Sequence, residues 1–303
     1  PGDEVISTAQ TCFASQIGAL HRHAVIRWAD VDPITGLIDP ECVGKLITPK
    51  TKAIIAVNWG GRLCDFKILK SYGIPVIEDA AHSWDVFNDS TNERGDYVCY
   101  SFQAIKYLTT GDGGILVCPE EKEKEARILR WYGLDRTKGQ SFRCTQNIES
   151  AGFKYHMNDI AATIGIANIP EARDSVEKQR KNSHLIIKSV NNPNIILPDW
   201  DETCSYWLFS MHVKNGRKDE FTKYLEDRGI TSSPVHYRND LYEMYPIVKG
   251  SECFPDWWKQ LPKSGIDFEF MEISRTMKSC SGFLEYLSES ACIRLWTDLA
   301  IKL

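Results

Sequence analysis

The sequence predicts an α/β fold built on a mostly parallel sheet that is covered by helices. Between Val5 and about Cys118, short apolar runs alternate with turn residues and with stretches of helical spacing, as they do in βαβ units. Parallel strands joined in this way need crossover helices, which cover both faces of the sheet. A strand-and-helix pattern between Cys204 and Gly229 indicates a second, smaller α/β domain.

The first sheet is predicted to contain five apolar runs, namely HAVIRWADV (23–31), TKAIIAVNW (51–59), IPVIEDA (74–80), DYVCYSF (96–102) and GGILVCP (113–119). Helical spacing in 39–49 and 64–73 provides two crossovers, and the second ends at Gly73 followed by Pro75, which is a stop signal. The chain therefore switches between strand and helix periods at short intervals, as a large α/β domain requires.

The later elements are predicted to be a charged helix (121–133), a second helix (157–169), a long connecting helix (170–190), a strand (205–213) and a further helix (217–229). We place the large domain at 1–170, with its N-terminal part missing, and the connecting helix and small domain at 171–303. Beyond about Lys249 the periodicity is lost, and this tail is atypical.

The composition excludes several classes of protein. A net charge of -5 over 303 residues attracts neither nucleic acid nor an anionic membrane surface. No apolar run approaches the roughly 20 residues that span a bilayer, and the first ten residues lack the features of a signal peptide. The 10 cysteines include no CxxC pair, which argues against a zinc or redox site and indicates reduced thiols. We expect a cytoplasmic protein without a metal, a nucleic-acid partner or a membrane span.

Polar side chains follow two of the predicted strands where their apolar runs stop. One strand ends in a polar segment that contains Asp79 and His82, and the next ends in a segment that contains Ser101, Gln103 and Lys106 and precedes a Gly-rich turn. Ligands of parallel sheets bind at the carboxyl ends of the strands. Pyridoxal 5′-phosphate (PLP) needs a lysine to form an imine, a carboxylate for the pyridine nitrogen and donors for the phosphate. These residues meet those needs, although a solvated lysine and a turn-forming aspartate are the alternatives.

Three motifs resemble, in order and spacing, the DegT/DnrJ/StrS family of PLP-dependent sugar aminotransferases: VIEDAAHS (76–83), GDYVCYSFQAIKYLTTGDGG (95–114) and GFKYHMNDIAATIGIANI (152–169). The similarity continues through most of the chain up to about Tyr245. It implies the type I PLP aminotransferase fold and PLP as the cofactor.

The resemblance also assigns roles to residues. Lys106 matches the Schiff-base lysine, and Asp79 matches the carboxylate that pairs with the pyridine nitrogen. His82 matches a residue near the ring and its 3-oxygen, with a histidine packed beneath the strand end as the alternative. Ser101 matches the hydroxyl that donates to the phosphate, and Gln103 is expected to face the substrate or the cofactor edge.

The third motif departs from the usual family sequence, GYNYRM. The Asn of that sequence completes the phosphate site of the other subunit in a homodimer, and Lys154 stands in its place here, with His156 at the Arg. A lysine still donates to phosphate. Asn158 is a possible substitute for the same role, and a helix N-cap is its alternative. The resemblance therefore implies a homodimer with shared active sites.

Two further departures concern the beginning of the chain. Family members have several dozen residues before the PGDEV segment, including a Gly-Thr turn at a helix N-terminus that holds the phosphate, and we expect that this segment is missing here. The family often has an aromatic residue that stacks on the cofactor after the residue matching Thr11. Here either Cys12 or Phe13 takes that position.

The resemblance implies amino transfer from an amino acid, usually glutamate, to a keto group of a nucleotide-linked deoxysugar used in polysaccharide biosynthesis. His236 and Tyr237 fall in the region that lines the substrate cleft, with an ordinary polar loop as the alternative.

The sequence also bears on three other functions. A PLP-dependent sugar dehydratase has histidine in place of the lysine, so Lys106 argues against it. A truncated, non-catalytic paralogue with a binding or regulatory role remains open because of the beginning and the tail of the chain. A nicotinamide enzyme is set aside because no GxGxxG follows a strand.

Overall fold

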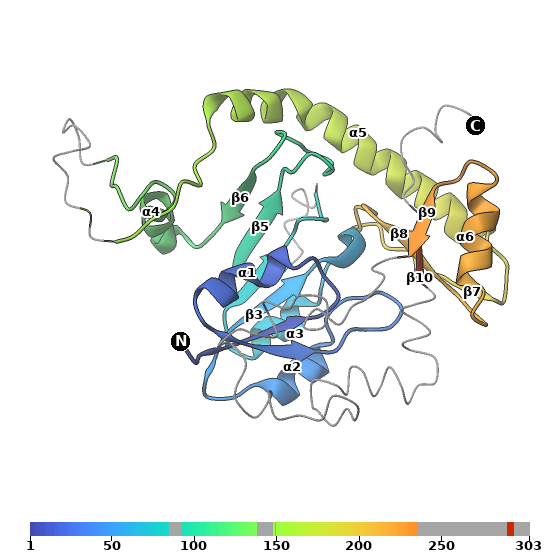
Figure 1. The fold of residues 1–303 in the computed structure, drawn as a ribbon, viewed down its shortest axis with the longest axis horizontal. Coiled ribbons are helices and arrows are strands. Elements are labelled where there is room, and N and C mark those ends of the chain that lie inside the picture. The colour runs from blue at the N-terminus through green and yellow to red at the C-terminus, as the bar shows by residue number, and fades with distance from the viewer. Residues whose placement is uncertain (85–92, 138–147, 149, 235–289, 294–303) are drawn as a thin grey trace.

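The computed structural model describes residues 1–84, 93–137, 148, 150–234 and 290–293 of the chain. Two sheets are joined by one long helix, α5 (Figure 1). The larger sheet has the strand order β2-β1-β3-β4-β5-β6, in which β1 to β5 pair in parallel and β6 pairs antiparallel to β5. The prediction of a mostly parallel sheet covered by helices is confirmed.

The strands of this sheet are β1 (Glu4–Thr8), β2 (Val25–Ala29), β3 (Thr51–Val57), β4 (Val76–Asp79), β5 (Tyr97–Ser101) and β6 (Gly114–Val117). The helices along this part of the chain are α1 (Ala14–His21), α2 (Pro40–Leu46), the 3-10 turn η1 (Trp59–Gly61), α3 (Phe66–Ser71) and α4 (Glu120–Leu129). Each of the five predicted strands is present, in a somewhat shorter form.

Helices cover both faces of the larger sheet. Successive side chains of a strand point to opposite faces, so Ile54 and Ile55 of β3 belong to different cores. Ile54 packs with Val43 of α2 and Leu69 of α3, whereas Ile55 lies in the cluster that Ala19 of α1 packs against. This two-sided burial explains why the strands are continuous apolar runs rather than alternating ones.

Helix α5 (Asp159–Ser189) is continuous, so the prediction of separate helices that meet at Pro170 is wrong. A proline inside a helix removes a hydrogen bond and costs about 3 kcal/mol. Ile169 and Ala172, on either side of it, pack into one core with strand β5, and Ile186 packs into the core of the second sheet. Packing on both sides thus outweighs the local penalty, and the predicted domain boundary at 170 falls inside this helix.

The second lobe consists of an antiparallel sheet of order β7-β8-β10-β9 and helix α6. Its elements are β7 (Ile195–Ile196), β8 (Phe209–Val213), α6 (Lys218–Glu226), β9 (Ser232–Pro234) and β10 (Ser290–Ile293). The strand predicted over 205–213 begins only at Phe209, because 205–208 form a loop that bonds to η1. Among the described residues, no helix has both the length and the apolar character of a membrane span.

Candidate active site

Strands β4 and β5 end next to each other at the carboxyl edge of the larger sheet. They pair in parallel with Asp79 opposite Cys99, and β5 ends two residues later at Ser101. The backbone N–H of Ala80 donates to the carbonyl of Cys99 at 2.9 Å. The structure therefore brings to one edge the two segments that carry the predicted cofactor residues.

Both carboxylate oxygens of Asp79 accept hydrogen bonds. Oδ1 accepts from the backbone N–H of Ala81 at 3.0 Å, and Oδ2 accepts from the hydroxyl of Ser15 at 2.6 Å. Ser15 lies in the first turn of α1, and its hydroxyl also bonds to that of Thr11 at 2.7 Å. These bonds fix the orientation of a half-buried carboxylate at the strand end.

Beneath this edge lies a buried polar network centred on Glu78, which is fully buried. Glu78 forms an ion pair with Arg94, whose Nε is 2.9 Å from Oε1. Asn58, at the end of β3, donates to Glu78 at 2.6 Å and to Ser83 at 2.9 Å. Burial works against the charge of Arg94, but the hydrogen bond and charge of Glu78 outweigh it and raise the pKa of Arg94. The network anchors the loop 80–83.

His82, in that loop, lies in a group of aromatic rings. Its ring stacks on that of Trp207, with centroids 4.0 Å apart and an interplanar angle of 16°, and meets Trp59 edge-on at 5.6 Å. The Nζ of Lys106 lies 4.1 Å from the centroid of the Trp207 ring. Trp207 therefore connects the residues that follow β4 and β5.

The loop before β8 holds both cofactor segments through Ser205. The hydroxyl of Ser205 donates to the carbonyl of His82 at 2.5 Å, and the hydroxyl of Tyr107 donates to the carbonyl of Ser205 at 2.8 Å. Burial raises the pKa of Tyr107 well above its ordinary value. Gly61 lets the loop approach, because a Cβ there would lie 2.1 Å from Ser205 Oγ.

Ser101 and Gln103 lie between the strand end and the lysine. The backbone N–H of Gln103 donates to Ser101 Oγ at 3.4 Å, and the Gln103 side chain accepts from the N–H of Ile105 at 3.2 Å. Gln103 is exposed, so its amide reaches solvent as well as the loop. The Ser101 hydroxyl is the acceptor in this bond, so its own proton can be donated to another acceptor.

The other two predicted cofactor residues lie beside α4 and the start of α5. The Nζ of Lys154 is 4.5 Å from the centroid of the Trp131 ring and 2.8 Å from Nδ1 of His156. The side chain of Asn158 accepts from the N–H of Ala161 at 2.8 Å and caps α5, as its alternative interpretation predicted. Within one chain, these two residues belong to a separate group from the strand-end residues.

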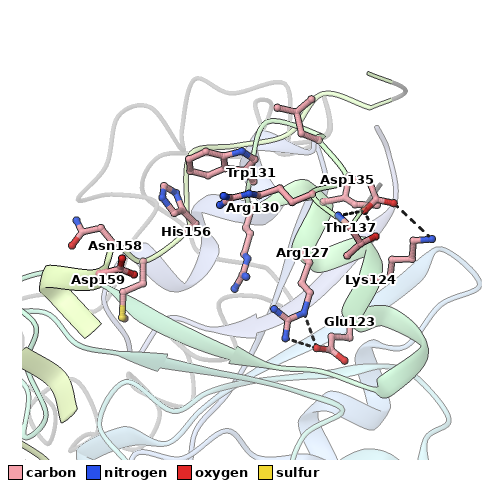
Figure 2. A pocket seen from close by; sticks show the side chains of 14 residues that line it. Glu123, Lys124, Arg127, Arg130, Trp131, Asp135, Thr137, His156, Asn158 and Asp159 are labelled. Carbon is pink, nitrogen blue, oxygen red and sulfur yellow. Dashed lines mark hydrogen bonds and ion pairs between the residues drawn. The ribbon is translucent and has the colours of Figure 1, made fainter. Parts of the chain in front are cut away.

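A cavity of about 680 Å³ opens next to this group, and Figure 2 shows the basic side chains of Arg127 and Arg130 around it. Arg136 lies 5.0 Å from the Trp131 ring. Desolvation and the charges of Lys154, Arg136 and Arg130 lower the pKa of His156. Among the described residues, no ion pair joins Arg130, Arg136 or Lys154 to a carboxylate. The group is suited to an anion.

Residues 1–255 match the DegT/DnrJ/EryC1/StrS aminotransferase family. The chain belongs to this family. The match includes both strand-end segments and the segment that contains Lys154.

Relatives of this family member were found among curated proteins and solved structures. It is 31% identical over 192 residues to the spore coat polysaccharide biosynthesis protein SpsC of Bacillus subtilis (strain 168), covering 60% of this chain and 49% of SpsC. The chain thus spans about half the length of that curated relative.

Two solved structures share the fold. The sugar aminotransferase CalS13 of Micromonospora echinospora has a TM-score of 0.78 and 24% identity, and the match covers 98% of this chain and 77% of CalS13. NtdA of Bacillus subtilis, solved with bound cofactor PMP, has a TM-score of 0.80 and 22% identity, and the match covers 98% of this chain and 64% of NtdA. The predicted fold class is therefore confirmed.

In this aminotransferase-family chain, the residues at the strand ends could be predicted as candidates from the sequence. The side chains that contact them were not predicted. Trp207 was predicted to lie in a strand, and no role was predicted for Ser15. His236 and Tyr237 lie outside the described residues.

Proposed function

We propose that the chain is a PLP-dependent aminotransferase that transfers an amino group from an amino acid, in the first place glutamate, to a keto group of a nucleotide-linked deoxysugar. The observation that carries the proposal is the placement of Asp79 at the end of β4 and of Lys106 just after the neighbouring parallel strand β5, in a member of an aminotransferase family. The names of two relatives support a sugar substrate and polysaccharide biosynthesis, since CalS13 is a sugar aminotransferase and SpsC belongs to spore coat polysaccharide biosynthesis.

The strand-end residues fit the chemistry of PLP. Asp79 and Lys106 are both only partly buried, so a ligand can reach the carboxylate and the amine. Each oxygen of Asp79 accepts one hydrogen bond from the protein and retains a further lone pair for a ring N–H. Ser101 supplies a hydroxyl donor suited to a phosphate oxygen.

When bound, PLP supplies an electron sink that stabilises negative charge on the substrate carbon. The residues of this chain then hold and move protons. Asp79 would keep a proton on the pyridine nitrogen, and Ser15 keeps Asp79 oriented. Lys106 Nζ would bind the cofactor and, as a free amine, would act as the base and acid that moves a proton between the substrate carbon and the cofactor. His82, stacked against Trp207, would lie beside the cofactor ring.

The phosphate site is proposed to be completed by a second copy of the chain. Within one chain, Lys154 and Asn158 lie with Trp131 and α5 rather than at the strand ends, and Arg130 and Arg136, which join no carboxylate within the part of the chain that the structure describes, add positive charge that suits a phosphate. We therefore place Lys154 and Asn158 at the partner's cofactor in a cytoplasmic homodimer. Gln103, His236 and Tyr237 are assigned to the substrate.

Absorbance of the purified chain after addition of PLP tests the proposal. We expect a band near the edge of the visible range that shifts when glutamate is added. Lys106→Ala should abolish the band, and Lys52→Ala, at an exposed lysine of β3, should keep it. If saturating PLP gives no band with the parent chain, the enzyme proposal fails and a non-catalytic binding role is favoured. A band that responds to no amino donor contradicts amino transfer alone.

A further inference from the structure

Trp207 contacts Lys106 in two ways. The Nζ of the lysine lies 4.1 Å from the centroid of the indole ring. The indole Nε1 donates to the carbonyl oxygen of Ile105, the residue before the lysine, at 3.2 Å. One side chain therefore holds the charged end of Lys106 and the peptide from which it extends.

The same indole also holds His82, whose ring stacks on it at 4.0 Å. Stacked aromatic pairs have a preferred geometry, so the position of His82 depends on that of Trp207. The lysine and the histidine come from loops after different strands, and Trp207 sets the placement of one relative to the other.

The backbone around Trp207 is strained in a way that produces these contacts. Tyr206 has a φ of +50°, a left-handed conformation that costs free energy for any residue except glycine, and its side chain is buried. The N–H groups of Ser205 and Leu208 donate to the carbonyls of Gly61 and Gly60 at 3.0 and 3.2 Å. Strain of this kind persists only where the surroundings enforce it, and it concentrates at functional sites.

A lysine that binds a cofactor covalently is released and bonded again in each catalytic cycle. While it is released, its flexible four-carbon side chain must stay within reach of the reacting atoms. An indole face attracts an ammonium group more strongly than any other aromatic side chain does. The indole face of Trp207 lies against the Nζ of Lys106 and provides this attraction.

We propose that Trp207 is a positioning residue that holds the ammonium group of Lys106 whenever this lysine is not bonded to the cofactor. The proposal rests on the proposed function, because it concerns the reaction in which Lys106 takes part. Trp207 acts through Lys106 and His82, and it needs no contact with the substrate.

The first test uses the protein without cofactor. Its lysines are converted to ¹³C-dimethyl-lysines, and the Lys106 resonance is assigned by its loss in Lys106→Arg. The indole ring current should move this resonance upfield of the exposed lysines, as the Trp131 ring should do for Lys154. Trp207→Leu should cancel the displacement, Trp207→Phe should keep part of it, and Trp28→Leu should leave it unchanged. Trp28 is the control because it is a buried tryptophan of β2, the edge strand of the larger sheet, away from the loop before β8.

The second test uses the protein loaded with PLP. Trp207→Leu should lower kcat by about three- to tenfold, the range expected from losing one cation–π contact, with the KM for the amino donor within about twofold. Trp207→Phe should recover most of kcat, since it keeps an aromatic face. If Trp207→Leu does not fold, Trp207→Met, which is closer in length, replaces it in both tests.

An unchanged Lys106 resonance in Trp207→Leu would overturn the proposal, and so would a lost displacement with an unchanged kcat. A Phe variant as slow as the Leu variant would also contradict it. If the parent binds no PLP, the proposed function fails together with any role for Trp207 in amino transfer. The resonance would still show separately whether the contact exists.

Discussion

The hydroxyl of Ser15 donates a hydrogen bond of 2.6 Å to Oδ2 of Asp79, and this bond joins helix α1 to the end of strand β4. The carboxylate assigned to the pyridine nitrogen is thus oriented by a residue 64 positions earlier in the chain. A hydrogen bond to a charged group contributes about 1.5–3 kcal/mol.

Ser15→Ala is expected to lower kcat of the PLP-loaded protein by about tenfold, because a less well oriented Asp79 holds the ring proton less effectively. Steady-state kinetics with glutamate measure the effect. Ser15→Thr keeps the hydroxyl and serves as the control. Equal rates for the parent and the Ala variant would remove Ser15 from the site.

Gly61→Ala should destabilise the protein more than Gly73→Ala does. Both glycines have positive φ, at +99° and +68°, so each alanine pays about 1–2 kcal/mol for the left-handed backbone. Only at Gly61 would the new Cβ meet Ser205 Oγ at 2.1 Å and the carbonyl of His82 at 2.9 Å, which adds about 1–3 kcal/mol. Urea unfolding compares the two variants. Equal losses of unfolding free energy in the two variants would mean that the loop before β8 moves away from the new Cβ at little cost.

Lys154→Ala should raise the PLP concentration needed for half-saturation by about tenfold, since a charged donor to phosphate is lost. Lys122→Ala is the control, because Lys122 is a lysine of α4 that pairs with Glu125 at 3.2 Å. Titration of the absorbance band measures both variants. The assignment of Lys154 to the phosphate fails if its variant titrates like the control.

Stability should fall as the pH rises above about 9. Burial raises the pKa of the Cys204 thiol from its ordinary value of 9.0 to about 12. The folded state therefore favours the neutral thiol, and its contribution is complete below pH 9 and is lost as the pH rises towards 12. One thiol contributes at most about 1.4 kcal/mol per pH unit.

Cys204→Ala should consequently flatten the plot of unfolding free energy against pH in this range, whereas Cys12→Ala, at an exposed cysteine, should not. Urea denaturation at a series of pH values gives the slopes. Parallel curves for the parent and Cys204→Ala would show that this thiol does not control alkaline stability.

The larger sheet could be predicted from the sequence because its strands are apolar on both faces and are separated by clear turn signals. Residues such as Ile54 and Ile55 belong to opposite cores but give one continuous apolar run. The same pattern singled out Asp79 and Lys106 as candidates, because ligands of parallel sheets bind at the carboxyl ends of the strands, although each residue alone also has an ordinary structural explanation. The family resemblance then supplied the cofactor.

The structural features that were not predicted from the sequence depend on tertiary packing. Pro170 is a helix breaker by local rules, yet the cores around Ala172 and Ile186 keep α5 continuous through it. Trp207 stands in an apolar run that predicts a strand, but hydrogen bonds hold its loop against Gly60 and Gly61, and its ring lies against Lys106 Nζ. Contacts between segments more than a hundred residues apart leave no period to detect.

The loop before β8 has a mechanical consequence. Ser205 bonds to His82, Tyr107 bonds to Ser205, and Trp207 bonds to the residue before Lys106, so these bonds join the second lobe to the two loops that carry the predicted cofactor residues. A movement of the second lobe away from the larger sheet would have to break these hydrogen bonds.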